Sequence, residues 1–246
     1  MEFTTVATDA FQKFQLNAGV ILTEFDPTNP PSTAEEMAAM RSKIFLATSG
    51  GASFTVAPEF VDFGEDVDNV PANTKEMKVL QSVTATMSGT GKTVDTAVAR
   101  SLMAAADVSG DKITPRADLR QEDFRDLWWV GDYSDQNTGE NAGFMAIRLI
   151  NALSTGGFSM QSNSNGKGDF AFEYTGHYSI SDMARLPYEV YIHTGTAYTY
   201  TEVTPEGTEN PSEEGWYERS GSAGSYTYAL STDTEVAEDK TYYTRS

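Results

Sequence analysis

The feature that most limits the fold of this chain is the alternation of apolar and polar side chains in short stretches. In residues 79–88, Val79, Val83 and Met87 fall on one face of an extended strand, and mostly small polar side chains fall on the other. Successive side chains of a strand point to opposite faces of its sheet, so this period of two predicts a half-buried β-strand. Gly, Asn, Asp and Ser separate stretches of this kind along the chain, which predicts a mainly β protein.

Other stretches of the chain have the composition of strands as well. Polar residues that favour turns separate them, and the stretch 162–168 has the composition of a hairpin loop. The predicted strands are Phe14–Phe25, 43–47, Asp126–Val130, Phe144–Leu153 and Phe170–Ile180, with a turn at Ser49–Gly51.

One segment has the period of a helix. Val94, Val98 and Leu102 recur every four residues, Asp95 stands at the positive end, and Gly110 lies just past the other end. The sequence therefore predicts one flanking α-helix over about 94–106.

Residues 48–77 do not follow the regular alternation. They contain Pro58, Gly64, Pro71 and an acidic run at 65–68, and their apolar residues are irregularly spaced. An excursion of this length in a compact domain usually has a function or is mobile. We therefore expect a long functional loop over 48–77.

The charge of the chain limits its partners. It has 36 acidic and 17 basic residues, for a net charge of −19, so it lacks the basic footprint that binding to nucleic acid usually requires. The same charge disfavours anionic membrane surfaces, and no stretch is long and apolar enough to span a membrane. With no cysteine and only His177 and His193, disulfides and thiolate chemistry are excluded and a histidine-based catalytic or metal site has little to draw on. We expect synthesis and folding in a cytoplasm.

The composition changes near Pro187. All 13 Phe residues precede position 188, whereas nine of the 12 Tyr residues lie at or after it, which favours a domain edge there. Within 188–246, which is acidic, the segments 198–200 and 215–220 return in degenerate form at 226–228 and 241–246. This repeat predicts two similar β-hairpins; a Tyr-rich extension of low complexity is the alternative.

The segment Gly89–Thr93 (GTGKT) has the context of a phosphate-binding loop, because it follows a strand and precedes a helix. Two features weigh against nucleotide binding. Thr86 stands where the motif needs its first Gly, and the preceding strand is half polar, unlike the buried strand of a phosphate-binding fold. The alternative is a turn and a helix start with Lys92 in solvent.

Three other patterns are weak. The spacing of Asp107, Ser109, Asp111 and Asp118 resembles a calcium loop, but Gly110 comes one place early and the closing Glu is missing. Glu173 and His177 share a strand face about 13 Å apart, too far for a direct acid–base pair. Trp128 and Trp129 could offer a sugar platform, but neighbouring strand residues face opposite ways, so we expect one in the core and the other half exposed or at an interface.

Several blocks of the sequence, in order and without large gaps, resemble one family of proteins. The blocks are LNAGVILTEFDP (16–27), EFVDFGEDVDNVP (59–71), MKVLQSVTATMSGTGKTV (77–94), ARSLMAAADVSGDKITPRADL (99–119), FRDLWWVGDYSD (124–135) and FMAIRLINALSTGGFSMQSNSNGKGDFAFEYTGHYS (144–179). They resemble the major tail (tail tube) proteins of long, non-contractile-tailed bacteriophages, and the resemblance covers roughly residues 14–192.

The resemblance implies a fold and an assembly. The fold is a two-sheet antiparallel sandwich or half-barrel with a flanking helix in residues 1–187, followed by the hairpin extension 188–246. Six copies of such a protein form a ring whose inner sheets join into one β-barrel, and rings stack into the tube of the virion tail. DNA passes through this tube without specific binding, and the tail-tip or baseplate, tape-measure and tail terminator proteins are the other partners. No catalytic residue, cofactor or metal is implied.

The resemblance and the strand pattern together assign candidate residues. A strand with one apolar and one small polar face suits a barrel that is packed outside and wet inside. The candidate lumen-facing residues are Ser82, Thr84, Thr86, Ser88, Glu173 and Thr175; in the loop 48–77, which would reach the next ring, the candidates are Glu59, Glu65, Asp66 and Asp68.

The acidic composition suits such a conduit, because a negative wall would let DNA slide instead of holding it. Three alternatives stay open at this point: a tail terminator or head–tail joining ring protein, a carbohydrate-binding virion module based on the Tyr- and Trp-rich end, and a nucleotide enzyme based on GTGKT.

Overall fold

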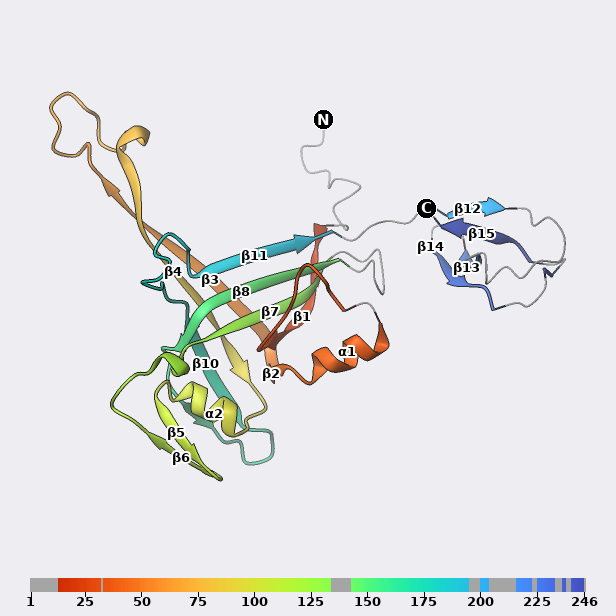
Figure 1. Ribbon diagram of the computed structural model, residues 1–246, viewed down its shortest axis with the longest axis horizontal. Helices are drawn as coiled ribbons and strands as arrows, with labels where there is room; N and C mark the ends of the chain where they lie inside the picture. The colour runs from red at the N-terminus through yellow and green to blue at the C-terminus, as the bar shows by residue number, and fades with distance from the viewer. Residues whose placement is uncertain are drawn as a thin grey trace. The chain divides into compact units, whose positions relative to one another are not determined.

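The computed structural model describes residues 13–31, 33–133, 143–194, 200–203, 216–222, 225–232, 236–237 and 240–245. Contacts divide the chain into two units, residues 1–195 and 196–246 (Figure 1). The first unit contains helices α1 (Ala34–Arg41) and α2 (Thr96–Leu102), 3-10 turns at Lys75–Met77 and Gln121–Asp123, and strands β1 (Gln15–Leu22), β2 (Ile44–Leu46), β3 (Thr48–Asp62), β4 (Lys78–Gly91), β5 (Ala106–Ser109), β6 (Lys112–Pro115), β7 (Arg125–Tyr133), β8 (Phe144–Ser154), β9 (Ser159–Gln161), β10 (Asp169–Thr175) and β11 (Tyr188–His193).

The long strands of this unit form two antiparallel sheets that share β8. Sheet A has the order β2-β1-β7-β8-β11, and sheet B consists of β3, β4, β10 and β9 together with the last residues of β8. Strand β8 passes from one sheet to the other beyond Asn151, which has a left-handed φ of 48°. The predicted mainly β, two-sheet antiparallel fold is confirmed.

The main core lies between the two sheets. Residues of sheet A such as Leu127 and Leu149 pack there against Met87 and Tyr174 of sheet B, and all four are nearly inaccessible to solvent. Helix α2 contributes Val98 and Leu102 to the same core, as the helical period predicts. Burying this apolar surface removes it from water, and this is the main favourable contribution to folding.

Helix α2 is shorter than the predicted segment 94–106. Asp95 caps its first turn by accepting a hydrogen bond from the Val98 N–H at 2.8 Å. The helix ends at Leu102, because Ala104 takes a left-handed φ of 60° and the chain turns directly into β5.

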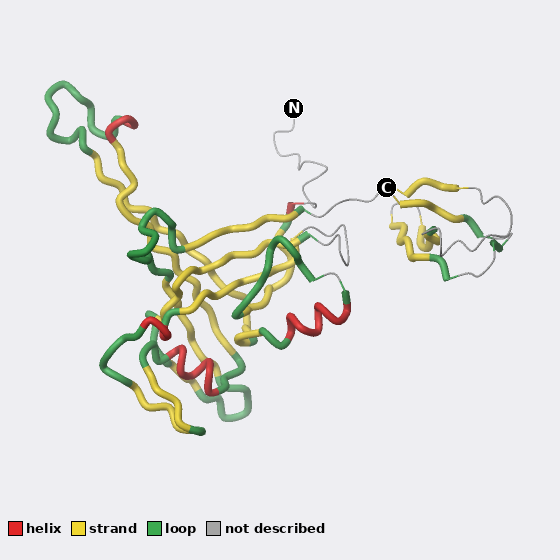
Figure 2. The backbone as a smooth tube through the Cα atoms, in the orientation of Figure 1, coloured by secondary structure: helices red, strands yellow, loops and turns green. Residues whose placement is uncertain are grey.

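Helix α1 was not predicted, although its start carries a recognisable signal. Thr33 and Glu36 form a capping box, in which Oγ1 of Thr33 accepts from the Glu36 N–H at 3.2 Å and the Glu36 carboxylate accepts from the Thr33 N–H at 3.0 Å. None of the residues of this helix is fully buried, so packing does not require a regular apolar period in its sequence, and the period is weak. Helix α1 belongs to the excursion 23–43 and is drawn in red beside sheet A (Figure 2). Phe25 and Met40 of this excursion pack against the second face of the sheet.

The expectation of a loop over 48–77 is wrong for about half of its length. Residues 48–62 form β3, which pairs with β4 along a 15-residue hairpin strand; only residues 63–74 are loop. The pairing shifts register twice, because Gly50 and Gly51 are extra residues on β3 and Gln81 is an extra residue on β4 opposite the step from Glu59 to Phe60. Gly50 and Gly51 have left-handed φ values of 76° and 81°, so the turn predicted at Ser49–Gly51 is a β-bulge inside the strand.

The second unit forms a separate four-stranded sheet. Its strands are β12 (Tyr200–Val203), β13 (Tyr217–Ser222), β14 (Ser225–Leu230) and β15 (Tyr242–Arg245), in the order β12-β15-β13-β14. The repeated segments pair across the repeat: β13 and β15 meet in the middle, with Tyr217 opposite Tyr243, and β12 and β14 flank them. Among the strands that the structure describes in this unit, only β13 and β14 are consecutive and paired, so the two predicted hairpins are not found there.

The division between the units lies after Gly195 and not near Pro187. Strand β11 pairs with β8 along Tyr188–His193 and therefore belongs to sheet A, although its residues share the Tyr-rich composition of the second unit. Within the described residues, no helix is both long and apolar enough to cross a membrane.

Candidate functional site

The open face of sheet B collects the residues that were assigned to a lumen. Glu173 and Thr175 of β10 stand opposite Ser88 and Thr86 of β4, so side chains on these paired residues share one face. Strand β3 continues this face on the other side of β4, and we call the whole surface the hydroxyl face. Its members are Ser53, Thr55, Ala57 and Glu59 of β3, Ser82, Thr84, Thr86 and Ser88 of β4, and Ala171, Glu173 and Thr175 of β10.

Alternation along β4 explains why this face stays polar. Val83, Ala85 and Met87 are buried in the core, and the residues between them are half-buried or exposed. The apolar face predicted from Val79 onward holds only from Val83, because the extra residue Gln81 interrupts the alternation of β4 and because Val79, which is 48% exposed, lies beyond the core.

Hydrogen bonds among side chains order the hydroxyl face. The Ser82 hydroxyl donates to the Glu59 carboxylate at 2.8 Å, at one end of the face. At the other, the Thr155 hydroxyl lies 2.9 Å from that of Thr175 and donates to Glu173 at 3.2 Å. These bonds hold the side chains of Glu59 and Ser82 at one end of the face and those of Glu173 and Thr175 at the other.

The hydroxyl face is only sparsely acidic. It contains two carboxylates, Glu59 and Glu173, and no Lys, Arg or His. Their partners on β4, Ser82 and Ser88, are six residues apart, which separates the two carboxylates by about 20 Å along the strand. The expectation of an acidic lining therefore rests on these two side chains of the face.

Residues 60–80 of the β3–β4 hairpin extend beyond the rest of sheet B as a two-stranded arm (Figure 1). The loop 63–74 forms the tip of this arm. Past Glu59, large apolar side chains are exposed: Phe60 by 52%, Phe63 by 63% and Leu80 by 43%. Sequence reasoning missed these residues as a surface, because their irregular spacing gave no strand signal. The only sign of this surface in the sequence was the presence of large apolar side chains in a segment that was expected to be a loop.

The arm tip is held by a carboxylate. Asp62 accepts hydrogen bonds from the backbone N–H groups of Gly64 at 2.9 Å and Asn73 at 2.7 Å, and these bonds lower the pKa of Asp62. Of the candidate inter-ring residues, Glu65, Asp66 and Asp68 are exposed in this tip. Glu59 is not with them, because it lies on the hydroxyl face.

The GTGKT segment does not form a phosphate-binding loop. Its first three residues belong to β4 and pair with β10 as extended strand. The Lys92 ammonium pairs with the carboxylate of Asp169, whose pKa is lowered by this contact, so Lys92 is neither free for phosphate nor in open solvent. The segment serves as a connection between sheet B and α2.

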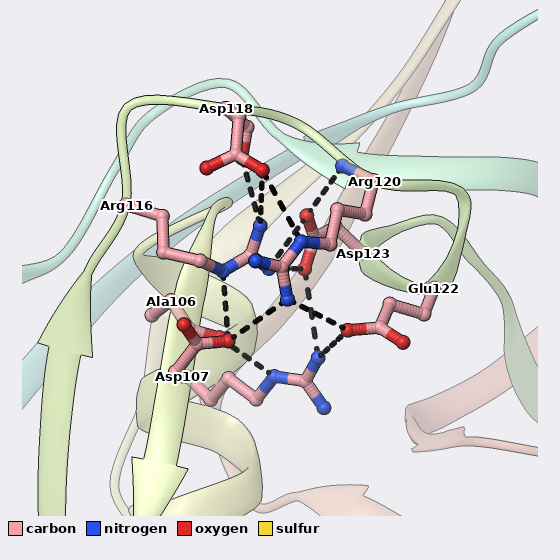
Figure 3. Close-up of polar contacts among 8 residues, drawn as sticks. Ala106, Asp107, Arg116, Asp118, Arg120, Glu122 and Asp123 are labelled. Atoms are coloured by element: carbon pink, nitrogen blue, oxygen red, sulfur yellow. Dashed lines mark hydrogen bonds and ion pairs between the residues drawn. The ribbon is translucent and has the colours of Figure 1, made fainter.

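The calcium-like segment belongs to a network of ion pairs (Figure 3). Arg116 binds Asp123 through two hydrogen bonds of 2.7 and 3.0 Å, and the Arg120 backbone N–H donates to the same carboxylate at 2.8 Å. Burial opposes the charge of Asp123, but the Arg120 N–H and the Arg116 guanidinium outweigh it and lower the pKa of Asp123. Asp107 pairs with Arg116 at 2.9 Å.

In this network Arg100, Arg116 and Arg120 pair with Asp107, Asp118, Glu122 and Asp123, and the pairs link β5 and α2 to the 116–123 segment. Within the part of the chain that the structure describes, no group of three or more acidic or histidine side chains is placed to hold a metal ion.

The remaining candidates take structural positions. Trp128 and Trp129 are both buried, at 6% and 8% exposure, on opposite faces of sheet A. The expectation that one would be half exposed is wrong, because the excursion 23–43 covers Trp128 with Phe25 at 5.8 Å between ring centroids. His177 packs edge-on against Phe124 and does not meet Glu173.

Comparison with known proteins gives little guidance. No family model and no curated protein matches the chain. Two solved structures are similar in part: the tail of an empty gene transfer agent particle, refined with C6 helical symmetry, and the virion of a native gene transfer agent particle. Their identities are 9% and 10% and their TM-scores 0.34 and 0.33, over 66% of this chain and 92% of each of theirs. Superpositions this partial assign neither fold nor function, so the proposal below rests on the residues of the chain.

Proposed function

We propose that this protein is the structural subunit of a phage-type tail tube, which assembles from stacked rings of six copies and conducts DNA. The observation that carries the proposal is sheet B, which is packed against a core on one face and lined by hydroxyl groups on the other. The ordered sequence blocks between residues 16 and 179 support it independently, because they resemble tail tube proteins.

The edges of sheet B suit closure into a barrel. In the described residues, β3 pairs only with β4, and β9 pairs only with β10, so both edges present unpaired backbone groups. Open edges are liable to pair with another chain, and a closed barrel removes them. Joining β3 of one copy to the β9 edge of the next would turn the hydroxyl face into the inner wall of a ring.

The arm supplies a contact between rings in this proposal. Exposed apolar side chains at a projecting tip favour burial against another subunit, because each removes apolar surface from water. Phe60 and Phe63 would bury their rings on the neighbouring ring, with the acidic tip residues at the rim of the contact.

The composition of the hydroxyl face fits a wall that DNA slides along. Phosphate binding requires Lys or Arg, and the face has neither. Glu59 and Glu173 would form two rings of like charge about 20 Å apart, which repel phosphates over roughly the 8 Å screening length of physiological salt. No enzymatic step is part of this function.

Negative-stain electron microscopy of the concentrated protein tests the proposal. Long tubes are expected, in keeping with the open sheet edges and the apolar arm. Isolated rings would favour a tail terminator or joining protein, and a chain that stays monomeric at every concentration, even when seeded with tail tips, would overturn the proposal.

The conduit itself is tested by changing the charge of the wall. Thr84→Lys and Thr86→Lys together would place twelve cations in each six-copy ring, and tubes of this variant are expected to retain DNA at low salt and release it at high salt. Wild-type tubes should not retain it. DNA retention by the wild type equal to that of the variant would contradict a repelling wall.

A further inference from the structure

The free edge of β3 is interrupted at Pro58, and the hydrogen-bond pattern shows which way this residue faces. In an antiparallel pair, opposed residues alternate between those that bond to each other and those whose N–H and C=O groups point away. On β4, the Val83 N–H donates to the Tyr178 hydroxyl at 2.8 Å, and the Ala85 carbonyl accepts from Gly176 at 2.9 Å. Both partners follow β10, so Val83 and Ala85 direct their backbone groups away from β3.

The residues of β3 opposite these two must therefore point to the free edge. Pro58 stands opposite Val83, and Val56 stands opposite Ala85. The same alternation directs the backbone groups of Phe54 outward, opposite Met87. Proline has no N–H, so the row of edge donors that includes Phe54 and Val56 stops at position 58.

The other end of this row is also marked. The bulge at Gly50–Gly51 breaks the regular pairing of β3 and β4 before Ala52. Between the bulge and the proline lies a regular edge of six residues, 52–57, and this is the part of β3 whose side chains alternate between the core and the hydroxyl face. Beyond Pro58 the strand enters the arm.

We propose that Pro58 is a register-determining residue, which confines strand pairing with a second copy of this chain to residues 52–57 and keeps the arm free. A strand added to β3 finds donors at Phe54 and Val56 and none at position 58, so pairing that runs on toward Phe60 is penalised by an unpaired carbonyl on the incoming strand. This inference rests on the proposed edge-to-edge assembly and names where its pairing stops.

Hydrogen exchange on assembled and dilute full-length protein tests the inference, with mass spectrometry of overlapping peptides. Exchange of the Phe54 and Val56 amides is expected to slow by at least about tenfold on assembly, and that of Phe60 and Asp62 much less. In the variant Pro58→Ala, which restores the donor, the slowing is expected to extend to position 58 and Phe60. Equal slowing on both sides of Pro58 in the wild type, or an unchanged pattern in Pro58→Ala, would overturn the inference while the tubes themselves still support the proposed function.

A matched pair of variants separates the edge donor from the side chain. Val56→Pro removes an outward N–H without touching the β3–β4 ladder, and Val56→Ala makes a similar loss of side chain but keeps the N–H. We expect Val56→Ala to assemble and Val56→Pro to remain monomeric with an unchanged circular dichroism spectrum. Assembly of both variants would show that this edge is not used, and a wild-type chain that never assembles overturns the proposed function together with the inference.

Discussion

The two halves of the β3–β4 hairpin are built from the same two strands, but one half is packed against a core and the other is exposed to solvent. In the body, residues 52–57 and 84–89 lie in a sheet with a core on one side and hydroxyl groups on the other. In the arm, residues 60–63 and 77–80 form only two strands, and Phe60, Phe63, Val79 and Leu80 are exposed. Two-stranded ribbons are marginal in water by themselves, so the body stabilises the fold and the arm is available for contacts with other molecules.

The largest expected effect comes from truncating the core side of the body. Met87→Ala, at a residue that is 1% exposed, is expected to lower the free energy of unfolding by about 2–5 kcal/mol, because it leaves a cavity. The matched change in the arm, Leu80→Ala, should cost less than about 0.5 kcal/mol, since Leu80 is already 43% exposed. Urea denaturation of the two variants measures both, and equal losses would remove the distinction between body and arm.

Much of the body could be predicted from the sequence, and the arm could not. Strands β4, β7, β8 and β10 follow from alternation or apolar runs, because a packed core imposes the period of two. In β3, only Ala52, Phe54 and Val56 alternate toward the core, between the bulge at Gly50–Gly51 and Pro58, so the periodic stretch is too short to stand out. No core acts on the arm, and its sequence is therefore free of a periodic constraint.

The hydroxyl face also contains residues that the sequence could place and residues that it could not. The residues Ser82 to Ser88, Glu173 and Thr175 could be placed on one face by alternation, and the strand pairing brings them together. Glu59 could not be placed on this face, because the sequence suggested a loop at this position. In the structure Glu59 lies in β3, opposite Ser82 of β4. Whether the backbone of Pro58 faces β4 or the free edge depends on which backbone groups of β4 bond toward β10. Only the three-dimensional pairing of the strands contains this information.

A change in the arm should affect assembly more than stability. Phe63→Ala removes a ring that is 63% exposed, so the urea midpoint is expected to stay within error of the wild type. The concentration needed for tube formation should rise about tenfold, corresponding to roughly 1.4 kcal/mol of lost burial at a subunit contact. Light scattering across a dilution series measures it, with Val108→Ala, at an exposed residue of β5, as the control. An unchanged assembly threshold would mean that the arm does not dock through Phe63.

A smaller effect is expected from acid, and it should be confined to the arm. Hydrogen bonds from Gly64 and Asn73 lower the pKa of Asp62 in the folded state. Its contribution to stability is therefore present above its unfolded pKa of about 4 and is lost as the pH falls through the lower folded value. The amide signals of Gly64 and Asn73 in NMR spectra of the monomer should shift together below about pH 4. In Asp62→Asn this titration should disappear, and its persistence would assign it to another group.

The central claim is that the hydroxyl face lines the inside of an assembled tube. Because the chain has no cysteine, Thr86→Cys gives a single reactive thiol on this face. A small maleimide is expected to label this thiol in both dilute and assembled protein, whereas a maleimide on a large polyethylene glycol should label only the dilute protein. Full labelling of intact tubes by the large reagent would place the face outside and contradict the account.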